Sequence, residues 1–125
     1  MIRFVSVLLF ALMCASQATA QSISGTWAGS GHETHADGKS QDYPIVMVIG
    51  AGGGSIDYPS LGCGGSVSQR SGDATSAQYI ESITRGRDHC IDGGSITVNL
   101  VSGKLAWTWT GQGVSVTAVL ERSGR

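Results

Sequence analysis

The sequence predicts a small all-β domain, an antiparallel barrel of seven or eight strands, with a two-sheet sandwich as the alternative. Two observations carry this prediction. Beyond residue 20, apolar and polar residues alternate at period two over most of the chain, and 19 glycines punctuate the alternating segments. The clearest part is a meander of three strands at 96–100, 105–109 and 114–120, joined by tight turns. Such short up-and-down connections favour a closed barrel, because closure leaves no exposed strand edges.

The strands before the meander follow from the same alternation. Predicted strands lie near residues 23–30, 43–49, 55–58, 66–69 and 75–84, and the polar segments 31–41 and 85–94 are predicted as loops. The last of these strands puts Tyr79, Glu81 and Ile83 on one side. Pro59 must end the short strand before it, because proline cannot donate to a central ladder.

The first 20 residues are typical of a secretory signal peptide. They contain one basic residue at position 3, an apolar run at 4–13 and the small-residue ending Ala18-Thr19-Ala20. The apolar run is too short to span a bilayer, and no second run of spanning length follows it. We therefore predict a cleaved leader, 1–20, and a single β domain, 21–125, in the periplasm or outside the cell.

The cysteines predict one disulfide. Cys14 belongs to the leader, so the mature domain has two cysteines, Cys63 and Cys90. Two cysteines in an oxidising compartment favour a Cys63–Cys90 bond. One alternative is a reactive or metal-binding thiol pair, but the C-x-x-C spacing is missing. Another is lipid attachment at Cys14, for which a small residue would be expected in place of Met13.

The charge of the mature chain argues against two classes of partner. It carries seven Lys and Arg residues against nine Asp and Glu residues, with no basic cluster. Nucleic acids and anionic membrane surfaces are bound by clustered positive charge. Neither is therefore expected as a partner.

One segment carries a family resemblance. The stretch Tyr58-Pro59-Ser60-Leu61-Gly62-Cys63-Gly64-Gly65 resembles a small bacterial secreted domain, together with Gly25-Thr26-Trp27, Tyr79-x-Glu81-x-Ile83 and Leu105-x-Trp107-x-Trp109. This domain is found alone behind signal peptides and at the C-terminal, extracytoplasmic end of some bacterial serine/threonine kinases. The resemblance implies a sensing or binding role outside the cytoplasm, and it brings no catalytic residue or ligand. The opening Gly-x-Trp is also similar to lipocalin-like and avidin-like (calycin) barrels.

The aromatic residues and one acid are the candidate ligand-binding residues. Every aromatic residue of the mature chain is Trp or Tyr, so each has a polar atom on an apolar body. The candidates are Trp27, Tyr58, Tyr79, Glu81, Trp107 and Trp109. The competing interpretation, favoured for the tryptophans, is that they only fill the core.

Glu81 is the most informative candidate, because it shares a strand side with Tyr79 and Ile83, which should face inward. A buried carboxylate needs a partner or a polar cavity. Arg85 or Arg87 would make it part of a structural ion pair, which is the favoured interpretation. A ligand anchor is the alternative.

Other polar clusters do not match a known chemistry. His32-Glu33-Thr34-His35 with Asp37 lacks the H-E-x-x-H spacing of a zinc helix and is predicted as a surface loop, so no metal site is expected. Asp88, His89, Asp92 and Ser95 lie close in sequence, but closeness in sequence does not define a triad. The glycine runs have no following helix or lysine to hold a phosphate. We therefore predict no cofactor and no enzymatic activity.

The sequence thus predicts a secreted or periplasmic module that binds a small molecule or a cell-envelope glycan through an aromatic-lined cavity or barrel mouth. The alternative is a protein-directed module, such as an inhibitor of a lytic enzyme or an envelope interaction partner. In that case the loops 31–41 and 85–94 would carry the contacts.

Overall fold

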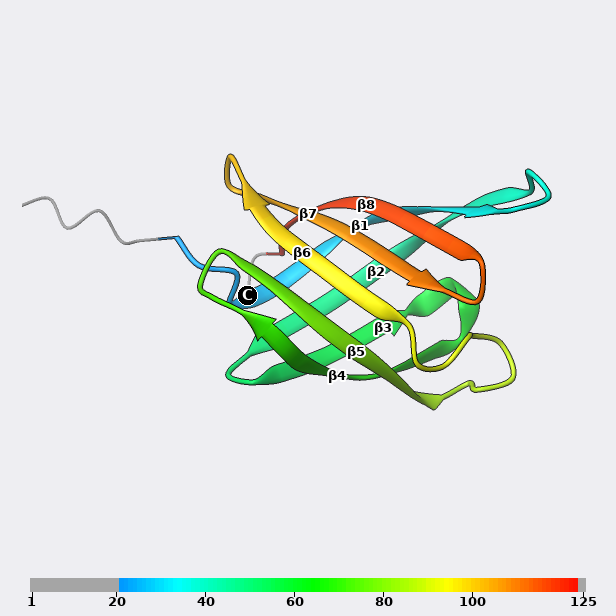
Figure 1. The fold of residues 1–125 in the computed structure, drawn as a ribbon, viewed down its shortest axis with the longest axis horizontal. Helices are drawn as coiled ribbons and strands as arrows, with labels where there is room; N and C mark the ends of the chain where they lie inside the picture. Colours follow the sequence, from blue (N-terminus) through cyan, green and yellow to red (C-terminus); the bar gives the residue numbers. More distant parts are fainter. Residues whose placement is uncertain (1–20, 124–125) are drawn as a thin grey trace, which may run out of the picture.

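The computed structural model describes residues 21–123, and the predicted leader lies outside the described residues. Eight antiparallel strands form a closed up-and-down barrel in which β8 pairs with β1 (Figure 1). The strands are β1 (Gly25–His35), β2 (Ser40–Gly50), β3 (Gly53–Tyr58), β4 (Cys63–Gly72), β5 (Ser76–Arg85), β6 (Ser95–Val101), β7 (Lys104–Gly111) and β8 (Val114–Arg122). A single 3-10 turn, η1 (Pro59–Leu61), separates β3 from β4. The barrel prediction is confirmed.

The core follows the predicted alternation. In the meander, Ile96 and Val98 of β6 and Leu105 and Trp107 of β7 are fully buried, while the residues between them face outward or are only partly covered. Alternate residues of β5 are likewise buried, as the period of two predicted. The middle of the barrel is therefore filled by side chains.

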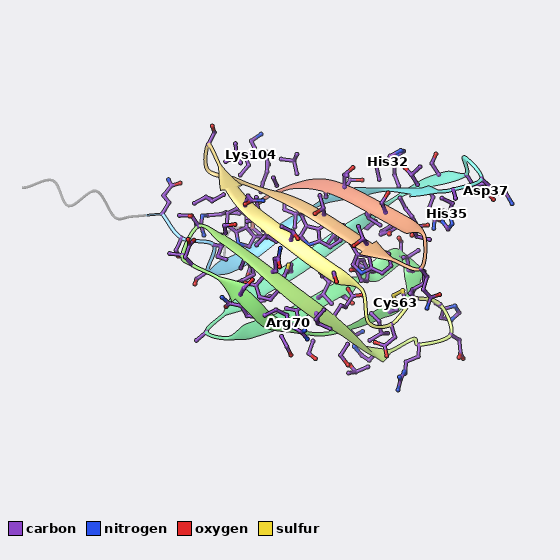
Figure 2. All side chains as sticks on the ribbon, in the orientation of Figure 1. His32, His35, Asp37, Cys63, Arg70 and Lys104 are labelled. Atoms are coloured by element: carbon purple, nitrogen blue, oxygen red, sulfur yellow. A yellow bond between two sulfur atoms is a disulfide. The ribbon has the colours of Figure 1, made fainter. Side chains whose placement is uncertain are left out.

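The two ends of the barrel differ, and we name them by their connections. The open end carries the β1–β2 turn at 36–39, η1, the β5–β6 connection at 86–94 and the β7–β8 turn at 112–113. The closed end carries residues 21–24 and the three short turns between β2 and β3, β4 and β5, and β6 and β7. In Figure 2 the labelled His35 and Cys63 lie toward the open end, and Lys104 lies at the closed end.

Residues 21–24 cover the closed end. Ile23 is buried, its backbone N–H donates to the Ala74 carbonyl (2.8 Å), and its own carbonyl accepts from Trp27 Nε1 (2.8 Å). The Arg122 guanidinium lies 4.4 Å from the centre of the Trp27 ring and donates to the Ser24 carbonyl (2.9 Å). Hydrogen bonds to its backbone thus hold this segment over the core, and the cation–π contact with Trp27 orients Arg122, which donates to that backbone.

The segment 31–41 corrects one prediction. It is not a loop: β1 continues to His35, β2 begins at Ser40, and the pairing extends to Thr34 opposite Ser40. The resulting hairpin projects beyond the rest of the barrel (Figure 1). The residues are mostly polar because the hairpin extends past the apolar core, so the apolar alternation that marks other strands is missing.

A disulfide joins Cys63, the first residue of β4, to Cys90 in the β5–β6 connection, which confirms the predicted bond. The two connections also touch through their backbones. A side chain at Gly86 would meet the Gly62 carbonyl at 2.1 Å, so only glycine fits there. Within residues 21–123, no helix has the length and apolar character needed to cross a membrane.

Candidate functional site

A cavity of about 270 Å³ lies at the open end of the barrel. Side chains from the hairpin, β3, η1, β5, the β5–β6 connection and β7 surround it. They are Glu33, His35, Gln41, Tyr43, Tyr58, Leu61, Glu81, His89, Cys90, Ile91 and Trp109. The cavity therefore combines three aromatic rings and an apolar wall with a few polar groups, the usual composition of a small-molecule site.

Glu81 is the most buried polar group of the cavity, with 2 % of its surface exposed. Its Oε2 accepts a hydrogen bond from the Tyr58 hydroxyl (2.5 Å), and its Oε1 accepts one from Trp109 Nε1 (3.1 Å). Burial raises the pKa of Glu81, the two hydrogen bonds oppose that rise, and the nearby Asp92 charge adds to it. The predicted inward orientation of Glu81 is confirmed.

Its predicted ion pair with an arginine is wrong. Arg85 Nη2 binds Asp57 (3.0 Å) and Arg87 Nη2 binds Asp92 (3.1 Å), all at exposed positions. Strict alternation would place Arg85 on the side of Glu81. A β-bulge intervenes, because Ile83 pairs with Gly65 whereas Arg85 pairs with the adjacent Gly64, and the extra residue turns Arg85 outward.

Trp109 is positioned by two glycines. A Cβ at Gly94 would lie 2.1 Å from Trp109 Nε1, and a Cβ at Gly111 would lie 2.8 Å from the far edge of the same ring. The indole therefore packs directly on backbone at both places. This contact fixes the ring in the orientation in which its N–H reaches Glu81.

Tyr58 is positioned by the turn that follows it. Proline ends β3 and starts η1, and Gly62 closes the turn in the left-handed region (φ 69°), with its N–H donating to the Pro59 carbonyl (3.3 Å). The turn places Leu61 in the cavity wall and starts β4 at the disulfide. The most specific part of the predicted resemblance thus builds one wall of the cavity.

The adjoining wall, formed by the β5–β6 connection, is tied to β5 through its backbone. Glu81 N–H donates to the Gly94 carbonyl (2.9 Å), and Gly93 N–H donates to the Glu81 carbonyl (3.2 Å). Asp92 Oδ1 accepts from the backbone N–H groups of Ile83 (2.8 Å) and Gly93 (3.0 Å). Because of these hydrogen bonds, with a smaller contribution from Arg87, the pKa of Asp92 is lowered and the carboxylate stays ionised. The connection that carries His89, Cys90 and Ile91 is therefore held both by the disulfide to Cys63 and by hydrogen bonds to β5.

Glu33 forms the rim of the cavity. Its carboxylate accepts hydrogen bonds from Gln41 Nε2 (2.8 Å) and the Tyr43 hydroxyl (2.9 Å), and it contacts His35 Nε2 (2.8 Å). Partial burial acts to raise the pKa of Glu33, but these hydrogen bonds together hold the pKa below its ordinary value. The rim thus carries a fixed negative charge.

Two tyrosines connect the rim to the floor. The rings of Tyr43 and Tyr58 meet edge to face, with centres 5.9 Å apart and planes at 83°. Burial, together with the adjacent carboxylates, raises the pKa of both phenols well above the ordinary value. Both hydroxyls therefore remain protonated and serve as hydrogen-bond donors.

The structure brings half of the candidate residues together. Tyr58, Glu81 and Trp109 meet at the cavity, whereas Trp27, Tyr79 and Trp107 are buried elsewhere and do not line it. Trp27 belongs to the closed end. Tyr79 Oη and Trp107 Nε1 are buried without a hydrogen-bond partner.

The rim residues were missed because they lie in the segment predicted as a loop. Extending the strand through it would have placed Gly31, Glu33 and His35 on one face. That face is the inner one, and His32 on the other face pairs with the exposed Asp42. Among the described residues, no three His, Cys, Asp or Glu side chains gather as a metal site would require.

Fold and cavity together define the class of protein: a small eight-stranded β-barrel with a polar, aromatic-lined cavity at one end. The chain matches no family model, and no curated protein matches it. The resemblance to the kinase-associated secreted domain stays a prediction.

Proposed function

We propose that this protein is an exported binding module that holds one small molecule in the cavity at the open end. The observation that carries the proposal is Glu81, a buried carboxylate in the cavity wall that, among the described residues, receives hydrogen bonds from the neutral donors Tyr58 and Trp109 only. A buried carboxylate without a countercharge costs stability. Groups of this kind gather at binding and catalytic sites.

The size of the cavity limits the ligand. Sites for drug-sized molecules occupy about 300–1,000 Å³, so a cavity of about 270 Å³ suits a molecule of one ring or less. The disulfide supports export, because such bonds persist in oxidising compartments. A periplasmic or extracellular location belongs to the same proposal.

The three tryptophans provide the test. Only Trp109 lines the cavity, while Trp27 and Trp107 lie outside it, so the three indole N–H signals in an NMR spectrum separate a cavity ligand from a general effect. Glucose, N-acetylglucosamine, choline and benzylamine, each at millimolar concentration, form the first panel. We expect at least one compound to shift the Trp109 signal while the Trp27 signal stays in place. No shift at Trp109 with any compound, or equal shifts at all three, would contradict the proposal.

The protein-directed alternative has weaker support. Within residues 21–123, the large hydrophobic side chains that are well exposed are Val48, Val101 and Val119, on three different strands. A protein partner is usually bound through a larger contiguous apolar patch. The proposal treats the module as non-enzymatic, as the sequence predicted.

A further inference from the structure

The permanently charged side chains that line the cavity are all acidic. Two carboxylates line it, Glu33 at the rim and Glu81 below, together with the imidazoles of His35 and His89, and the lining includes no Lys or Arg. The nearest arginines of the β5–β6 region are bound to Asp57 and Asp92 on the outer surface. Within residues 21–123, Glu81 therefore receives no permanent positive charge through a hydrogen bond or an ion pair.

Glu81 retains capacity for a further partner. Each carboxylate oxygen can accept two hydrogen bonds, and each oxygen of Glu81 accepts one from the protein. Both of those donors are neutral. They orient the carboxylate without neutralising it.

The aromatic rings favour the same kind of ligand. Tyr43, Tyr58 and Trp109 line one small cavity, and the faces of such rings attract cations most strongly where water is excluded. The fixed negative charge of Glu33 at the rim adds an attractive field at the entrance. Glu81, the three aromatic rings and Glu33 at the rim thus all favour a positively charged ligand.

We infer that the ligand is a small organic cation, an amine or quaternary ammonium ion on a compact apolar body, whose charge is neutralised by Glu81. This inference rests on the proposed function and names its ligand class. Neutral sugars, which the sequence left open, would leave the Glu81 charge unmatched. An anionic ligand would be repelled by both carboxylates.

Matched pairs of probes test the inference on the wild-type protein. Choline is compared with its uncharged carbon isostere, in which a tert-butyl group replaces the trimethylammonium group, and benzylamine is compared with benzyl alcohol. Titration calorimetry and the Trp109 indole signal give the affinities. We expect the charged member of at least one pair to bind at least about tenfold more tightly than its neutral partner.

The outcomes separate the two proposals. Equal or tighter binding of the neutral members, or of glucose, overturns the cation inference and leaves the proposed function in place. No response of Trp109 to any of these compounds overturns both. Because the comparison needs no variant, it holds even where a substitution prevents folding.

The Glu81→Gln variant then tests whether the charge of Glu81 causes the preference for the charged probe. It keeps the size of the side chain and an accepting oxygen, and we expect the preference for the charged probe to fall to about twofold or less. Glu121→Gln is the matched control, because Glu121 is exposed on β8 and pairs with Lys104 far from the cavity. An unchanged preference in Glu81→Gln would overturn the inference, whereas a general loss of packing would weaken both members of a pair alike.

The pH dependence gives an independent readout with choline, whose own charge is constant. Bound choline favours ionised Glu81, so its affinity should rise with pH through the raised pKa of the free protein and then level off, while Glu81→Gln lacks this rise. The titratable groups that face Glu81 or line its cavity are Tyr43, Tyr58, Asp92, Glu33, His35 and His89. Protonation of an imidazole would act in the same direction, so the profile is repeated in the His35→Asn/His89→Asn variant. If the rise in choline affinity is lost in His35→Asn/His89→Asn but persists in Glu81→Gln, the rise belongs to the histidines. That outcome would overturn the role of Glu81.

Discussion

The two ends of this barrel cover the same core in different ways. At the closed end, a segment of four residues lies over the core, with Ile23 buried and its carbonyl accepting a hydrogen bond from Trp27 Nε1. At the open end, polar side chains line a cavity, and the connections around it are held by a disulfide and by hydrogen bonds to Asp92. The difference teaches that a cavity in a small barrel needs an end that side-chain packing does not fill. The connections around that end must then be held by other interactions, here a disulfide and hydrogen bonds.

Glycines allow close approach of backbone at both ends, and at the open end they also place backbone against Trp109, a side chain of the cavity. Gly94 and Gly111 bring backbone into contact with the Trp109 ring, and Gly86 brings one connection against the other. At the closed end, Gly53, Gly54 and Gly72 also lie close against neighbouring backbone, whereas Gly50 and Gly52 have open space around them.

The largest effect is expected from the disulfide. Cys63 and Cys90 are 27 residues apart, and opening such a loop removes about 3.5 kcal/mol of stability in the chain-entropy model. Urea unfolding with and without a reducing agent measures this loss. We also expect reduction to shift the Trp109 indole signal more than that of Trp27, because the bond borders only the open end.

The Cys63→Ala/Cys90→Ala variant is the control for that experiment. Its stability should match that of the reduced protein and should not respond to the reducing agent. An unfolding midpoint unchanged by complete reduction would show that packing alone fixes the open end, and the contrast between the ends would fail.

The second effect concerns the closed end. Ile23 is buried at the end of the barrel, so Ile23→Ala should lower the free energy of unfolding by about 2 to 3 kcal/mol. Ligand affinity at the open end should remain within about twofold, because sites this far apart and without shared partners behave independently. Val101→Ala, at a 56 % exposed position, is the control and should change stability by less than about 0.5 kcal/mol. A loss of ligand affinity in Ile23→Ala would mean that the closed end supports the cavity.

The barrel was more predictable than its open end. Alternation at period two reports which side of a strand faces the core, and it placed Tyr79, Glu81 and Ile83 inward as the structure has them. It carries no information on which inward residues meet across the barrel. Tyr58 and Trp109 reach Glu81 from 23 and 28 residues away, and only barrel closure and strand stagger set that meeting.

Two local features could not be predicted from the alternation of apolar and polar residues. The bulge in β5 turned Arg85 away from Glu81, and a bulge adds one residue without a distinctive sequence signal. The β1–β2 hairpin beyond Gly31 has little core to face, so its strands lack apolar alternation although their backbones pair fully. The rim residues Glu33 and His35 could be placed only once that pairing was known.

A smaller effect tests the contact between glycine and Trp109. Gly94→Ala would put a Cβ against the indole, where the nearest atom would be 2.1 Å away, so the ring must move and its hydrogen bond to Glu81 should be lost. We expect a loss of about 1 to 3 kcal/mol in stability, typical of overpacking, and a shifted Trp109 indole signal. Gly50→Ala is the matched control, with an ordinary φ and open space around its Cβ, and should leave both readouts nearly unchanged. Equal behaviour of the two variants would contradict the role assigned to Gly94.

The smallest effect concerns the cost of the Glu81 charge. Its pKa in the folded protein lies above the ordinary value of 4.5, so the unfolded chain releases this proton at lower pH than the folded chain. The contribution of Glu81 to stability therefore falls as pH rises from about 4.5 through the raised pKa, by about 1.4 kcal/mol for each unit between the two values. Glu33, Asp73 and Asp92 have lowered pKa values and act oppositely, with stability lost as pH falls through their folded values.

Comparison of the wild-type protein with Glu81→Gln isolates the Glu81 contribution, because the other carboxylates are common to both. Urea unfolding between about pH 4 and pH 8 should show the variant gaining stability relative to the wild type as pH rises. Added choline, if it neutralises Glu81, should reduce that relative gain by stabilising only the ionised wild type. A stability difference that stays constant over this range would mean that Glu81 ionises without cost, and that the open end already contains the positive charge that we assign to the ligand.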